Sequence, residues 1–66
     1  MITPEEVVER VAQIDSIADD FEAAHSEEDR LYRDVLYAIV AGSPYPQQLA
    51  TEALNSRQIH FQRYCA

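Results

Sequence analysis

The sequence predicts an all-α fold: a helical hairpin over residues 4–41, closed by a short third helix and an apolar C-terminal tail. Three observations predict it. Apolar residues recur at helical spacing in two long stretches, Thr3 and Pro4 mark a helix start, and the only glycine, Gly42, stands where the second stretch ends. With 66 residues and no internal repeat, the chain is expected to form a single small domain, residues 1–66.

The first predicted helix begins at residues 3–6. Thr3 is a good N-cap, Pro4 suits the first helical position, and Glu6 completes a capping box three residues after the cap. Glu6 is also spaced to pair with Arg10 on the solvent side. We expect this helix to continue to about residue 17 on an apolar stripe. The stripe consists of Val7, Val11, Ile14 and Ala18, widened by Val8 and Ile17.

Asp19 and Asp20 leave two positions open for the break between the first two helices. Both residues are good N-caps and compete for backbone hydrogen bonds, so we expect the break at residues 18–20. The alternative is a restart at Ser26, where the sequence resembles a capping box. The second helix then runs from about residue 21 to 41, and Gly42 supplies its left-handed end. Its apolar arc contains Phe21, Ala24, Leu31, Tyr32, Val35, Leu36 and Ile39.

The third predicted helix begins at Pro46 and ends near residues 55–56. We expect Leu49 and Ala53 to face the hairpin, with Leu54 at the margin. The remaining residues, 57–66, are too apolar to form a free end. They are expected to lie extended over the hairpin or to form a partial helical turn. The apolar residues of this tail are Ile59, Phe61 and Tyr64.

Charge excludes some functions. The net charge is −7, with eleven acids against three arginines in residues 1–34. This excess disfavours direct binding to nucleic acid or to anionic membranes. A single cysteine, Cys65, and the lack of a signal peptide or long apolar run predict a cytoplasmic protein that does not span a membrane. Because so small a core is only marginally stable alone, we expect a protein partner or a homodimer.

Glu28 is the most unusual residue of the second helix, because its helical phase places it near the middle of the apolar arc. A carboxylate there is costly unless it is paired, hydrogen-bonded or protonated. His25, Glu28 and Asp29 are candidate metal ligands on one helix face. Glu28 with a raised pKa could instead act as a general base. The plain structural alternative is that Glu28 pairs with His25 or Arg10, or meets solvent. No catalytic motif or cofactor is predicted, so we expect no enzyme.

The aromatic residues suggest a binding face. Six of them are more than a core this small can readily bury, and Tyr37 falls off the main arc of its helix. Tyrosine is favoured at interfaces because it gives a large contact area at low entropic cost. The predicted interaction residues are Tyr32, Tyr37, Tyr45, Tyr64 and Phe61.

Two patterns carry a resemblance: Asp-Asp-x-Glu-Ala-Ala-His-Ser-x-Glu-Asp-x-Leu-Tyr from Asp19, and the ending Phe-x-Arg-Tyr-Cys-Ala. Over residues 10–66 the chain resembles a group of small helical proteins encoded by actinobacteria and their phages and prophages. Members of that group more often have Trp at the position of Tyr64. No activity is attached to the group. The resemblance implies a phage or prophage source and leaves the function open.

The sequence therefore predicts a non-enzymatic acidic protein-interaction module, an accessory protein that acts on a host protein. One alternative is a DNA mimic whose acidic face occupies a nucleic-acid-binding protein. Another is a metal-binding helical protein that uses His25, Glu28 and Asp29.

Overall fold

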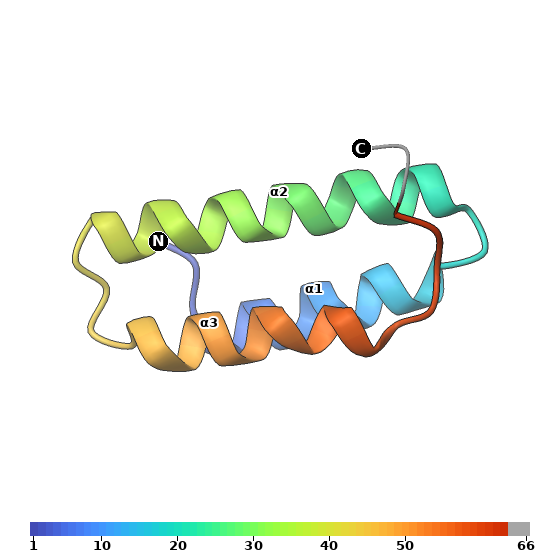
Figure 1. The fold of residues 1–66 in the computed structure, drawn as a ribbon. Helices are drawn as coiled ribbons and strands as arrows, with labels where there is room; N and C mark the ends of the chain where they lie inside the picture. Colours follow the sequence, from blue (N-terminus) through green and yellow to red (C-terminus); the bar gives the residue numbers. More distant parts are fainter. Residues whose placement is uncertain (64–66) are drawn as a thin grey trace.

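Three helices pack side by side in the computed structural model, which describes residues 1–63 (Figure 1). The elements are α1 at Pro4–Ser16, α2 at Phe21–Val40, α3 at Pro46–Leu54, and a 3₁₀ turn, η1, at Asn55–Gln58. Each helix contacts the other two, so α3 closes the hairpin that α1 and α2 form. The predicted all-α fold, a helical hairpin with a short third helix, is confirmed.

The start of α1 forms as predicted. Thr3 Oγ1 accepts a hydrogen bond from the Glu6 backbone N–H at 3.2 Å, and Glu6 Oε1 accepts one from the Thr3 backbone N–H at 3.0 Å. This capping box satisfies two backbone donors that the first helical turn leaves without partners. Arg10 pairs across the hairpin with Asp34 at 2.7 Å. This ion pair joins α1 to α2, and the sequence spacing of Glu6 and Arg10 did not predict it.

Asp20 sets the break between α1 and α2. Its side chain accepts a hydrogen bond from the Ala23 N–H at 3.3 Å, which makes it the N-cap of α2. The predicted break at residues 18–20 is confirmed, and the alternative restart at Ser26 is wrong because α2 runs through it unbroken. At the other end Gly42 has φ +91°, and its N–H donates to the Ile39 carbonyl at 3.0 Å. The predicted glycine stop is confirmed.

The core lies between the inner faces of the three helices. Its buried apolar residues are Val7 and Ile14 of α1, Ala24, Leu31, Val35 and Ala38 of α2, and Leu49 and Ala53 of α3. The predicted arc of α2 was too wide, because Leu36 is 63% exposed. Val35 points inward, and Leu36 lies about 100° further round the helix, at the edge of the face that α1 and α3 cover. Val8 of α1 and Leu54 of α3 are exposed for the same reason.

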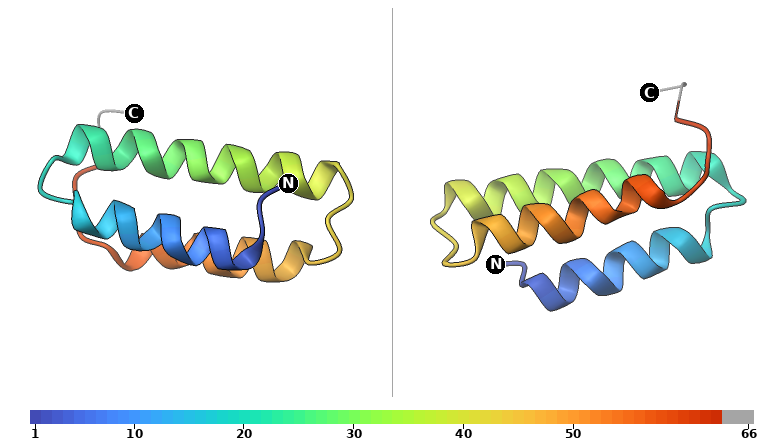
Figure 2. Two further views of the ribbon diagram at one scale, coloured as in Figure 1. Left: turned by 180° about the vertical axis from the view of Figure 1, so that it is seen from behind. Right: turned by 60° about the horizontal axis from the view of Figure 1, so that its bottom comes forward.

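The C-terminal tail uses both of the conformations left open by the sequence. Residues 55–58 form the 3₁₀ turn, and Ile59 then turns the chain into an extended path. The tail runs from the end of α3 to the N-terminal half of α2, as Figures 1 and 2 show. Ile59 and Phe61 pack against the core. Tyr64 and Cys65 lie outside the described residues.

Within residues 1–63, no helix combines the length and the apolar character needed to cross a lipid bilayer.

Candidate functional site

Glu28 lies in the core and is fully hydrogen-bonded there. The residue Glu28 is only 2% exposed. Arg63 Nε donates to Oε1 at 2.9 Å, Arg63 Nη2 donates to Oε2 at 3.1 Å, and Ser56 Oγ donates to Oε2 at 2.6 Å. The Tyr32 hydroxyl is 2.7 Å from Ser56 Oγ. Because serine has one hydroxyl proton and gives it to Glu28, Tyr32 is the donor in this pair.

The Arg63 guanidinium makes further contacts besides those to Glu28. Nη2 also donates to the carbonyl oxygens of Ser56 and Ile59, both at 3.0 Å, and Nη1 donates to the Phe61 carbonyl at 3.4 Å. The guanidinium carbon lies 3.8 Å from the centroid of the Phe61 ring, which is a cation–π contact. The described side chains leave none of the buried polar atoms in this network without a partner.

Burial alone would raise the pKa of Glu28, because a buried carboxylate loses its hydration. Hydrogen bonds from Arg63 and Ser56, together with the charges of Arg63 and Arg57, outweigh that effect. The pKa of Glu28 is therefore lowered from its ordinary value, and the hydrogen bond to Glu28 raises the pKa of Arg63. The raised pKa that a general base would need is thus the wrong expectation for Glu28.

The structure does not bring the predicted metal ligands together. Glu28 points into the core, whereas His25 Nε2 lies 3.8 Å from the exposed Asp29 carboxylate on the side of α2. Among residues 1–63, no three His, Cys, Asp or Glu side chains are close enough to hold a metal ion. The sequence correctly singled out Glu28, but it missed Ser56 and Arg63 as partners. Nothing in the local pattern marks them, because they follow Glu28 by 28 and 35 residues.

A second feature is an apolar groove between α2 and α3, with a volume of about 300 Å³. All of the side chains that line it are aliphatic or aromatic. They are Tyr32, Val35, Leu36, Ile39, Ala50, Ala53 and Leu54. Leu36 and Leu54, on its two helices, are 63% and 60% exposed. We call this feature the α2–α3 groove. Its two alanines, Ala50 and Ala53, are small and lie on α3, so a docked segment can approach the α3 backbone closely.

The apolar surface continues from the groove over the outer side of α2. Tyr37 is 67% exposed and Val40 is 85% exposed, and both line a neighbouring hollow that also contains Tyr32 and Leu36. Asp29 and Arg33 are the charged residues of that hollow. Single exposed apolar residues are ordinary, but a continuous apolar surface with a polar rim marks a binding site.

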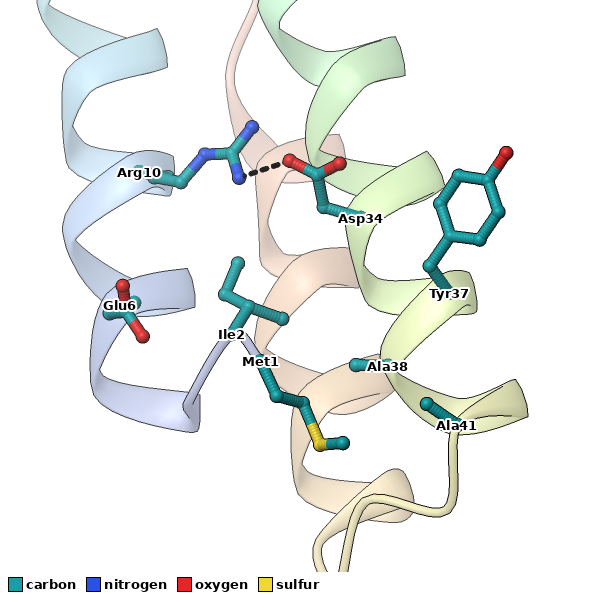
Figure 3. Close-up of a pocket in the computed structure, with 8 residues that line it drawn as sticks. All are labelled: Met1, Ile2, Glu6, Arg10, Asp34, Tyr37, Ala38 and Ala41. Atoms are coloured by element: carbon teal, nitrogen blue, oxygen red, sulfur yellow. Dashed lines mark hydrogen bonds and ion pairs between the residues drawn. The ribbon is translucent and has the colours of Figure 1, made fainter.

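A third hollow lies between α1 and α2, next to the N-terminal segment (Figure 3). Its volume is about 450 Å³. Figure 3 shows Arg10 and Asp34 pointing toward each other across it, with Met1, Ile2 and Ala38 below. The two charged groups are paired at 2.7 Å, so an ion pair between α1 and α2 crosses this hollow.

The predicted interaction residues are spread over the molecule. Tyr37 lies on the exposed apolar surface of α2, and Tyr32 forms one wall of the α2–α3 groove. Tyr45 is 54% exposed but belongs to the loop before α3, beside the N-terminal segment. Phe61 is partly buried beneath Arg63. Tyr64 is outside the described residues. The aliphatic members of the surface were missed, because Leu36 and Leu54 had been expected to lie in or beside the core.

The excess negative charge lies mostly away from the groove. Within residues 1–63, Arg10, Arg30 and Arg63 form ion pairs with Asp34, Glu27 and Glu28. Most of the other acids belong to α1, the following turn and the start of α2, and their side chains are exposed. These residues are Glu5, Glu6, Glu9, Asp15, Asp19, Asp20 and Glu22.

Comparison with known proteins finds no matching family model, no matching curated protein and no matching solved structure. The interpretation of the Glu28 network and of the α2–α3 groove therefore depends on their own geometry. Among residues 1–63, neither contains a group of three metal-ligating side chains.

Proposed function

We propose that this protein is a non-enzymatic interaction module that binds a helix of a partner protein in the α2–α3 groove. The observation that carries the proposal is the wholly apolar lining of the groove, with Leu36 and Leu54 exposed on its two helices. Leaving such side chains in water forgoes roughly 1.5–3 kcal/mol each, which a docked partner recovers.

A helix suits this groove because two neighbouring helices form it. On its inner side the α2–α3 pair already packs against α1. A helix with apolar residues at i, i+3, i+4 and i+7 would fill the outer side in the same manner and give a four-helix arrangement. Ala50 and Ala53 leave room for that helix to lie close to α3.

The charge of the chain favours a basic partner. At a net charge of −7, the protein attracts a positively charged helix over a distance and speeds its association. The groove itself is apolar, so charge would affect the association rate and the apolar contacts would hold the complex. The resemblance to proteins of phages and prophages makes a host protein the natural partner.

Labelled amphipathic helical peptides test the proposal by fluorescence anisotropy. Two peptides share one leucine stripe and carry either lysine or glutamate on the polar face. We expect the lysine peptide to bind the native chain, and Leu36→Glu or Leu54→Glu to weaken that binding about tenfold or more. Val8→Glu is the matched control, because Val8 is 50% exposed on α1 and should leave binding unchanged.

Equal binding by the native chain and the two groove variants would overturn the proposal. So would a native dimer that Leu36→Glu converts to a monomer, measured by light scattering, because a second copy would then occupy the groove. Circular dichroism of each variant confirms that the helices are retained before binding is compared.

One observation favours the DNA-mimic alternative: the exposed acids collect on residues 5–22. A partner bound by mimicry would be lost from the Glu5→Gln, Glu9→Gln and Asp15→Asn triple variant and in high salt. The same partner would be retained by Leu36→Glu. The opposite pattern, with retention by the acid variant and loss from Leu36→Glu, supports the groove.

A further inference from the structure

We propose that Glu28 and Ser56 form an arginine-binding site, and that its ligand class is the guanidinium group of an arginine on an extended peptide. In the single chain this site is filled by Arg63. Glu28 offers both carboxylate oxygens to the Nε and Nη2 donors, at 2.9 and 3.1 Å. Two such bonds side by side match the planar fork of a guanidinium group.

The site selects arginine over other cations. Besides Glu28, the guanidinium reaches the carbonyl oxygens of Ser56 and Ile59, to each of which Nη2 donates at 3.0 Å. A lysine ammonium is a compact point charge and cannot span these acceptors together. Glu28 is buried, and Ser56 is fully buried, so the carboxylate is presented at a defined position.

The carboxylate and the hydroxyl of the site belong to the folded bundle, and the Ile59 carbonyl lies at the start of the extended tail. Glu28 is in α2 and Ser56 is in η1, where the Tyr32 hydroxyl positions it at 2.7 Å. The tail itself is held differently. Within the described chain, the last backbone hydrogen bond is that of Ile59 to Ser56, and beyond it the tail is held by the Phe61 ring and the bonds of Arg63. Because side chains hold the tail, an arginine from another chain can make the same contacts.

Thermal melts of the full-length Arg63→Ala variant test the ligand chemistry. Ethylguanidinium at millimolar concentration replaces the missing group, and ethylammonium is the control for charge alone. We expect ethylguanidinium to raise the Tm of Arg63→Ala, and ethylammonium to leave it unchanged. The Glu28→Gln, Arg63→Ala double variant should respond to neither. Equal responses to the two cations, or an unchanged response in the double variant, would overturn the proposal.

Two further arms identify the source of the arginine. The Arg63→Ala variant keeps Glu28, and the Glu28→Gln variant keeps Arg63. If a second copy supplies the arginine, a mixture of the two variants should form a heterodimer, which light scattering detects. A short acetylated peptide ending in Gln-Arg-amide tests an arginine from another protein, with the lysine peptide as control. Either association supports the proposal that the site binds an arginine from another chain. Failure of both arms overturns the proposal even where ethylguanidinium binds.

The native chain provides the measurement if Arg63→Ala does not fold. The Arg63 Nε–H group is hydrogen-bonded to Glu28, so we expect its NMR signal to exchange slowly with water. Excess arginine peptide should displace Arg63 and speed that exchange, and the lysine peptide should not. Unchanged exchange at saturating peptide contradicts an exchangeable site.

Discussion

Arg63 donates two parallel hydrogen bonds to Glu28, which precedes it by 35 residues and lies in the middle of the buried face of α2. A carboxylate at that position would disrupt an apolar core if it had no partner. Here it fixes the tail, as far as Arg63, on the bundle. The stability of the tail and the charge state of the core therefore depend on the same pair.

Removing either partner of this pair should destabilise the fold by on the order of 3 kcal/mol, because the other charge is left buried and unpaired. We expect this for Arg63→Ala and for Glu28→Gln, measured by urea denaturation. Replacing both by methionine should cost much less than the two single losses added together, because no charge remains to be paired. Additive costs of Glu28→Gln and Arg63→Ala in the variant that combines these two substitutions would contradict a direct interaction.

The same pair predicts a loss of stability in acid. The pKa of Glu28 is lower in the folded protein than in the unfolded chain, so the unfolded chain binds its proton first as the pH falls. The contribution of Glu28 is complete above its ordinary pKa, about 4.3, and decreases as the pH falls through the folded value. From neutral to acidic pH, the urea concentration at the unfolding midpoint should fall less steeply for Glu28→Gln than for the native chain. Asp15→Asn, which removes a carboxylate at an exposed site, serves as the control for the loss of one negative charge.

The Arg10–Asp34 bridge should contribute much less than the buried pair. Its bond is short, at 2.7 Å, but its side chains are 24% and 38% exposed. Solvent and salt screen such a pair, so Asp34→Asn should lower the free energy of unfolding by about 1 kcal/mol or less. The difference from the native chain should shrink as salt is added. A loss as large as that of Arg63→Ala would show that the bridge is effectively buried.

Gly42→Ala should destabilise the protein by about 1 kcal/mol through backbone conformation alone. The residue has φ +91°, and a Cβ built there meets no atom within 4 Å, so steric crowding is not the cause. Thermal melts measure the loss, and Gly42→Asn should lose less because asparagine tolerates left-handed backbone better. Equal Tm values for the native chain and Gly42→Ala would rule out this explanation.

Features decided within a few residues were predictable from the sequence. The capping box of Thr3 and Glu6, the Asp20 cap and the Gly42 stop each depend on a local pattern, and each is found in the structure. The unusual character of Glu28 was also visible, because helical phase alone places it on the buried face. These predictions needed no knowledge of how the helices pack.

Features decided by packing were not predictable. Whether Leu36 is core or surface depends on how much of α2 is covered by α1 and α3, and the covered arc is narrower than the apolar arc of the sequence. The partner of Glu28 depends on the path of the tail after η1, which no local pattern specifies. The groove has the same origin, because Leu36 and Leu54 come from different helices and are brought together by the fold.

The long separation between Glu28 and Arg63 also bears on the order of folding events. The tail can be fixed only after α2 and η1 have come together, so this contact should form after the main barrier to folding has been crossed. In stopped-flow measurements, Arg63→Ala should therefore speed unfolding and leave the folding rate nearly unchanged. The contact between Arg63 and Glu28 would then determine how long the native state persists once it has formed.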